Sequence, residues 1–232
     1  MNDMNKKKTY SQKTKLFELI EENHKLLLLL PRFGIHLGFG EHSIEEVCKT
    51  EGISCELFLA VCQIYDERQA PHCDFNKMNI DQLLPYLLTS HRYYLDERFP
   101  HIEGHLQRII DAAGTKYGKM LKNFYGQYKQ EVVKHFDYEE KVVFPYIKDL
   151  MSGKRQGNYN IDEFRQNHSN IEDSLDDMMN ILIKYLPGDI LPKERIEISL
   201  DIKELFDDLY CHSLVEDEIL IPFVESLENT LP

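Results

Sequence analysis

The chain has 232 residues, of which 42% are hydrophobic and 29% charged, and its formal net charge is −13. This length allows one large or two small domains, and so acidic a chain is not expected to bind nucleic acid through a general basic surface. Its leucine run, residues 26–30, is far shorter than the roughly 20 apolar residues of a membrane span. The five cysteines include no CxxC pair, which is typical of a reducing compartment, so we expect a cytoplasmic protein with no membrane partner.

The first 75 residues predict a small helical domain. A loop-like stretch, residues 70–76, follows it and sets the predicted boundary between domains 1–75 and 76–232. Residues 44–66 have the outline of a helix-turn-helix with Gly52 in the turn. Its second helix would be apolar and acidic, without an Arg or Lys to contact phosphate or guanine, so nucleic acid is a disfavoured partner.

The remaining residues predict four long helices joined by short connections. Their expected ranges are about 81–113, 116–151, 162–186 and 192–228, each bounded by ordinary glycine, proline or capping signals. Short connections make sequential helices antiparallel. The predicted fold is therefore all-α, an up-down-up-down four-helix bundle preceded by the small helical domain.

Apolar residues recur every three or four positions along three of these helices, which is the pattern of a bundle core. The predicted core positions are Leu121, Tyr125, Tyr128, Val132, His135, Glu139, Val142 and Tyr146 in the second helix, Phe164, His168, Ile171, Leu175, Met178, Leu182 and Tyr185 in the third, and Ile202, Leu205, Leu209, His212, Glu216, Ile219 and Phe223 in the fourth.

Histidines and glutamates interrupt these apolar positions. His135 and Glu139 are four residues apart and share one helix face, and His212 and Glu216 repeat that spacing. His168 occupies a core position of the third helix. A charged carboxylate in a bundle core is costly unless it is paired or bound to a metal. The duplicated pair, followed in each case by a proline ten residues after the histidine, predicts two metal ions with bridging carboxylates.

The first helix offers three histidines as a further ligand, and depth in the bundle selects one. His135 lies about 20 residues after the first connection, whereas His91 lies about 23 before it and His105 about 9. At about 1.5 Å per residue, His91 misses the level of His135 by roughly 5 Å and His105 by roughly 15 Å. We therefore predict His91 as the ligand, and His101 and His105 as surface or otherwise satisfied histidines.

The predicted metal ligands are His91, His135, Glu139, His168, His212 and Glu216. Imidazole and carboxylate without thiolate suit iron or manganese better than zinc. Manganese or a mixed iron–manganese pair stays open. Glu172, four residues after His168, is left open between a seventh ligand and a group that holds an imidazole N–H.

These motifs resemble those of hemerythrin-like domains, and most those of the repair-of-iron-centres di-iron family. They are His91 before Phe99-Pro100, His135-x3-Glu139 before Phe144-Pro145, His168, and His212-x3-Glu216 before Ile221-Pro222. Oxygen-carrying hemerythrins have two histidines four apart on the third helix, and neither Phe164 nor Glu172 is a histidine here. The resemblance implies two non-haem iron ions with an oxo or hydroxo bridge, bridged also by Glu139 and Glu216.

The same resemblance implies a function. The di-iron site would bind or react with nitric oxide or oxygen, and would support the repair of iron–sulfur proteins under nitrosative or oxidative stress. Tyr94 and Tyr138 lie near the site along the sequence and would either hydrogen-bond such a ligand or pack in the core. The alternative is a di-iron sensor or binding module that acts through the N-terminal domain without turnover, and the pattern leaves enzymatic turnover and oligomeric state open.

The N-terminal domain is similar to the small domain of the same family over residues 33–41 and 44–53. That family commonly has adjacent cysteines where this chain has Leu-Gly-Phe-Gly at residues 37–40. We therefore expect Cys48, Cys55, Cys62 and Cys73 to be buried reduced thiols.

Overall fold

The computed structural model describes residues 10–71, 78–154, 157, 159–167 and 174–230. Its regular elements over these ranges are helices, and the only pairing of extended residues there is an isolated bridge between Lys15 and Ser43. The chain divides into two compact units, Met1–Leu87 and Leu88–Pro232, and the division falls within helix α5 (Leu83–Arg92). The all-α prediction is confirmed.

The N-terminal unit is a set of short helices. They are α1 (Leu16–Glu22), the 3₁₀ helix η1 (His24–Leu28), α2 (Leu29–Arg32), α3 (Ile44–Glu51), α4 (Cys55–Glu67) and the 3₁₀ helix η3 (Ile80–Gln82). A capping box of Ser43 and Glu46 begins α3, and Gly52 ends it in the left-handed conformation with φ 69°. Helices α3 and α4 thus form the two helices of the predicted helix-turn-helix outline.

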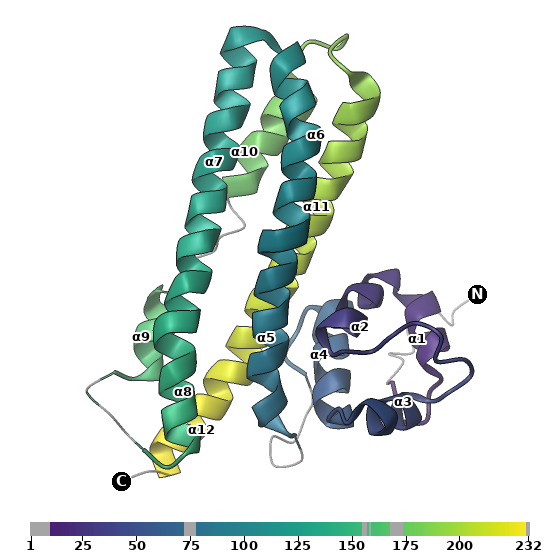
Figure 1. The fold of residues 1–232 in the computed structure, drawn as a ribbon, viewed down its shortest axis with the longest axis vertical. Coiled ribbons are helices and arrows are strands. Elements are labelled where there is room, and N and C mark those ends of the chain that lie inside the picture. The colour runs from purple at the N-terminus through teal and green to yellow at the C-terminus, as the bar shows by residue number, and fades with distance from the viewer. Residues whose placement is uncertain (1–9, 72–77, 155–156, 158, 168–173, 231–232) are drawn as a thin grey trace, which may run out of the picture. The chain divides into compact units, whose positions relative to one another are not determined.

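The C-terminal unit is the predicted up-down-up-down bundle (Figure 1), and π-helical turns occur along its described helices. In the first predicted helix lie α5, η4 (Tyr93–Arg98) and α6 (Phe99–Ala112), and in the second α7 (Gly114–Tyr138), η5 (Glu139–Val143) and α8 (Phe144–Met151). In the third lie α9 (Ile161–Asn167), α10 (Ser174–Asn180) and η7 (Ile181–Tyr185), and in the fourth α11 (Pro192–Val215), η8 (Glu216–Leu220) and α12 (Ile221–Thr230). Helices α6 and α10 each pack against both α7 and α11. This packing encloses one apolar core.

Each π-helical turn among the described residues lies just before a proline. In every case the residue before the proline donates its N–H to the carbonyl five residues earlier, and these donor–acceptor pairs are Phe99–Tyr94, Phe144–Glu139, Leu186–Ile181 and Ile221–Glu216. Proline has no N–H and its ring crowds the carbonyl four residues earlier. A π-helical turn adds one residue to the helix at that place and so relieves the crowding.

The added residue changes which side chains face the core. Val142 is 39% exposed, whereas the next residue, Val143, is fully buried. Tyr185 is 63% exposed, whereas Leu186 is buried. The predicted core positions Val142 and Tyr185 are therefore wrong, because an inserted residue rotates the following helix face by about 100°.

Candidate metal centre

Four predicted ligands come together at the π-helical turns. His91 lies in the last turn of α5 and His212 in that of α11, while Glu139 and Glu216 are the first residues of η5 and η8. One nitrogen or oxygen atom from each side chain lies within 4.8 Å of the corresponding atom of every other. All four residues are at most 1% exposed. They form one buried cluster, which we call the central cluster.

Glu139 lies between two imidazole rings. Its Oε2 is 3.0 Å from His91 Nε2, and its Oε1 is 2.5 Å from His135 Nε2. His135, whose side chain is 8% exposed, thus joins the edge of the central cluster. In the duplicated pair, His212 Nε2 lies 3.5 Å from Glu216 Oε1. Each glutamate therefore faces the histidine of its own His-x3-Glu pair.

The short contacts between these groups leave part of the buried polar surface without a well-directed hydrogen bond. His91 Nε2 and both carboxylate oxygens of Glu139 are buried and have no well-aligned hydrogen bond within the part of the chain that the structure describes. Leaving such groups buried costs free energy unless another partner is present. A cation between imidazole nitrogens and carboxylate oxygens would supply that partner, so the residues fit a metal.

The charged groups of the central cluster shift one another's pKa values. Burial alone would raise the pKa of Glu139, but the imidazoles of His135 and His91 outweigh it and hold that pKa below its usual range. Burial lowers the pKa of His91, whereas the carboxylates of Glu139, Glu216 and Glu140 raise it, and the carboxylates prevail. An ionised Glu139 in this apolar interior therefore requires positive charge beside it, which either the imidazoles or a bound cation supplies.

The sequence model of one protein family, the hemerythrin HHE cation binding domain, matches residues 83–225. The match covers more than half of the chain and includes all four residues of the central cluster. The chain belongs to this hemerythrin family. No curated protein matches it. The family binds metal cations, and the central cluster is the buried group of this hemerythrin domain that is able to hold one.

Glu140 contacts a histidine of the central cluster and was not among the residues predicted from the sequence. Its Oε1 lies 2.9 Å from His91 Nδ1, on the opposite side of the ring from the central cluster. A carboxylate on the outer nitrogen of a ligand histidine fixes the ring orientation and makes the inner nitrogen more basic. The signal was a second glutamate directly after Glu139, but its role depends on the orientation of His91, which spacing does not give.

Aromatic rings pack against the histidines of the central cluster. Phe136 stacks on His91 with ring centroids 3.9 Å apart and planes 9° from parallel. Tyr94, fully buried, meets His212 edge to face with centroids 5.6 Å apart. The hydroxyl of Tyr138, by contrast, lies 3.0 Å from that of Tyr159. Of the two tyrosines considered from sequence, Tyr94 therefore packs against the central cluster.

The other histidines of the bundle either lie outside the described residues or contact a different carboxylate. His168, the predicted ligand on the third helix, and Glu172 lie outside the described residues. His101 and His105 are not in the central cluster and lie beside Asp201 instead. The structure thus brings together His91, Glu139, His212 and Glu216, with His135 adjoining them.

No helix among the residues that the structure describes combines the length and the apolar character that a membrane-spanning helix requires.

Proposed function

We propose that this hemerythrin-family chain is a non-haem di-iron protein that binds or reacts with nitric oxide or oxygen. The observation that carries the proposal is the convergence of two imidazoles and two carboxylates within 4.8 Å in a fully buried position. The donors are nitrogen and oxygen without thiolate, which favours iron or manganese over zinc. The proposed ligands are His91, His135, Glu139, His168, His212 and Glu216.

The two glutamates would serve as the bridging ligands. Glu139 directs one oxygen toward His91 and the other toward His135, so a single carboxylate reaches donors on two sides. Glu216 holds the equivalent place in the second His-x3-Glu pair. Iron held by these residues would supply redox chemistry and, because two six-coordinate ions have more positions than four histidines and two bridging glutamates fill, room for a diatomic ligand.

The surrounding residues would orient the ligands and keep water out. Glu140 accepts from His91 Nδ1 and so directs Nε2 inward. Phe136 and Tyr94 cover the rings of His91 and His212 with apolar surface. Ionised groups interact more strongly in such a low-dielectric site than in water, which favours retention of the metal.

The physiological role that we propose is support of iron–sulfur cluster repair under nitrosative or oxidative stress, in the cytoplasm, with iron–sulfur proteins as partners. Its support is the resemblance of the two His-x3-Glu pairs, each followed by an aliphatic or aromatic residue and proline, to the repair-of-iron-centres family. Neither a membrane nor nucleic acid is part of the proposal.

Iron stoichiometry tests the di-iron proposal. We expect about two irons per chain after anaerobic reconstitution of the full chain, and loss of most of that iron in a variant with His135→Ala and His212→Ala. A matched double variant, His36→Ala with His42→Ala, changes two exposed histidines of the N-terminal unit and should keep its iron. One iron per chain or fewer in the wild type, or equal iron in both double variants, would overturn the proposal.

Turnover separates the two functions that the sequence left open. Catalytic loss of nitric oxide by the iron-loaded chain with an added reductant would support reaction. Stoichiometric binding without turnover would support the alternative of a di-iron sensor acting through the N-terminal unit. The His135→Ala, His212→Ala variant should show neither activity, which ties either result to the central cluster.

A further inference from the structure

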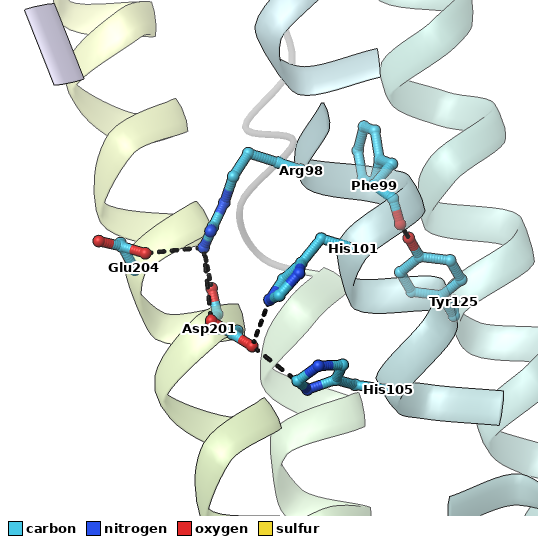
Figure 2. Close-up of polar contacts among 7 residues, drawn as sticks. All are labelled: Arg98, Phe99, His101, His105, Tyr125, Asp201 and Glu204. Carbon is cyan, nitrogen blue, oxygen red and sulfur yellow. Dashed lines mark hydrogen bonds and ion pairs between the residues drawn. The ribbon is translucent and has the colours of Figure 1, made fainter. Parts of the chain in front are cut away.

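A second group of metal-ligating side chains lies between α6 and α11, apart from the central cluster. His101 and His105 are four residues apart on α6 and therefore share one face of that helix. Asp201 on α11 faces them, with its Oδ2 3.2 Å from His101 Nε2 and 3.7 Å from His105 Nδ1 (Figure 2). One donor atom from each of the three lies within 4.8 Å of the others. We call these three residues the outer cluster.

A simple ion-pair interpretation leaves part of the outer cluster unexplained. The contact of Asp201 with His101 has hydrogen-bonding distance and geometry. That with His105 Nδ1, at 3.7 Å, is longer than a hydrogen bond. His105 Nδ1 is nevertheless buried and has no hydrogen-bond partner among the residues described. A buried nitrogen directed toward a carboxylate and a second imidazole is what a metal ion would require.

Neighbouring groups hold Asp201 in place and set the local charge. Arg98 donates to the backbone oxygen of Asp201 at 3.3 Å and approaches its Oδ1 at 3.8 Å, leaving Oδ2 toward the histidines (Figure 2). The positive charge of Arg98 is offset by Glu204, whose Oε2 lies 2.7 Å away. Arg98, Asp201 and Glu204 together carry one net negative charge, which favours a cation beside the two imidazoles.

We propose that His101, His105 and Asp201 bind a divalent cation of the zinc class, at a site separate from the central cluster. Three protein ligands, two imidazoles and one carboxylate, with a fourth position open to solvent, form the donor set of an open zinc site and lack the second carboxylate of the central cluster. The side chain of His101 is 47% exposed, so water can fill the fourth position and the ion would be exchangeable. His101 lies ten residues after His91 and Asp201 eleven before His212, so the two clusters are about 15 Å apart along the helices.

Calorimetric titration of zinc into the iron-reconstituted full chain tests the proposal. We expect one zinc ion per chain to bind without release of iron. His105→Gln and Asp201→Asn should each weaken that binding at least ten-fold. His36→Gln with His42→Gln, a matched change of exposed histidines, should leave it unchanged. Circular dichroism and iron content equal to wild type would show that the outer variants fold normally.

A structural readout separates this site from the proposed iron site. In crystals soaked with zinc, anomalous scattering at the zinc edge should give a peak between His101 Nε2, His105 Nδ1 and Asp201 Oδ2. The same peak should persist in the His135→Ala, His212→Ala variant, whether or not the wild-type chain holds iron. A zinc peak confined to the central cluster, or zinc affinity unaffected by His105→Gln and Asp201→Asn, would overturn the proposal.

Discussion

The central and outer clusters use the same side-chain types in different surroundings. Both place histidines next to a carboxylate from another helix. In the central cluster Glu139 and Glu216 are fully buried, whereas in the outer cluster the side chain of Asp201 is 21% exposed. Burial removes the water that would otherwise solvate a charge, so the central carboxylates depend on a cation much more than Asp201 does. The difference predicts tight metal binding at the first cluster and exchangeable binding at the second.

The largest change in thermal stability should follow removal of the metal from the central cluster. At a ligand concentration about 1,000 times Kd, binding stabilises the folded state by about 4 kcal/mol. When a chelator strips the reconstituted chain, this stabilisation is lost and the unfolding midpoint of the bundle should fall by about 10 °C. Zinc at about ten times its Kd for the outer cluster should raise the midpoint by about 4 °C at most.

Thermal unfolding followed by circular dichroism measures both changes. The His105→Gln variant serves as the control, because it should lose the zinc effect and keep the effect of chelation. Equal midpoints for stripped and reconstituted protein would contradict the expected dependence of the central cluster on metal.

The second largest change in stability is expected at η5, the π-helical turn that begins with Glu139. Val143→Ala should destabilise the bundle by about 2 kcal/mol, because it removes two buried methyl groups and leaves a small cavity. Val142→Ala, one residue earlier and 39% exposed, should change stability by less than about 0.5 kcal/mol. Urea unfolding of the two variants measures the difference, and helix propensity cancels because the substitution is the same. A larger loss for Val142→Ala would mean that η5 is a regular α-helix.

Sequence spacing was sufficient for the bundle and for part of the site. The His-x3-Glu pairs stand out because charged groups occupy core positions, and rise per residue distinguished His91 from His105. Spacing could not show that His101 and His105 meet Asp201, because that contact depends on how α6 packs on α11. The predicted core positions also rest on a constant helical period. That period fails at Val142 and Tyr185 because a proline downstream favours a π-helical turn.

Glu140 should hold His91 in its orientation toward the central cluster. Glu140→Gln keeps the size of the side chain but replaces a carboxylate by a weaker acceptor for His91 Nδ1. The expected result is roughly ten-fold weaker metal binding, the lower end of the range for such outer partners of ligand histidines. Competition with a chromophoric chelator measures it, and Glu97→Gln, an exposed glutamate of η4, is the control. Equal affinity in the two variants would show that the contact with Glu140 does not position His91.

The contrast between buried and exposed groups recurs among the cysteines of the N-terminal unit. The thiols of Cys48, Cys55 and Cys62 are free, and Cys48 and Cys62 are buried as expected, whereas Cys55 is half-buried and Cys73 lies outside the described residues. A hydrogen bond with Cys48 lowers the pKa of Cys55, while burial raises that of Cys62. Cys55 also begins α4, where the helix dipole favours a thiolate.

The smallest expected effect is a difference in the alkylation rates of the cysteines. Because the thiolate is the reactive form, Cys55 should be alkylated first, and its rate should rise with pH at a lower pH than that of an ordinary thiol. A pocket of about 460 Å³ lined by Cys48 and Cys55 gives the reagent access. In a Cys48→Ala variant the hydrogen bond is lost, so the midpoint of the Cys55 profile should move to higher pH. Mass spectrometry of the labelled peptides gives both profiles, and a Cys62→Ala variant, which leaves the Cys48–Cys55 contact in place, should keep the wild-type midpoint. If Cys62 reacts as fast as Cys55, burial does not control reactivity in this unit.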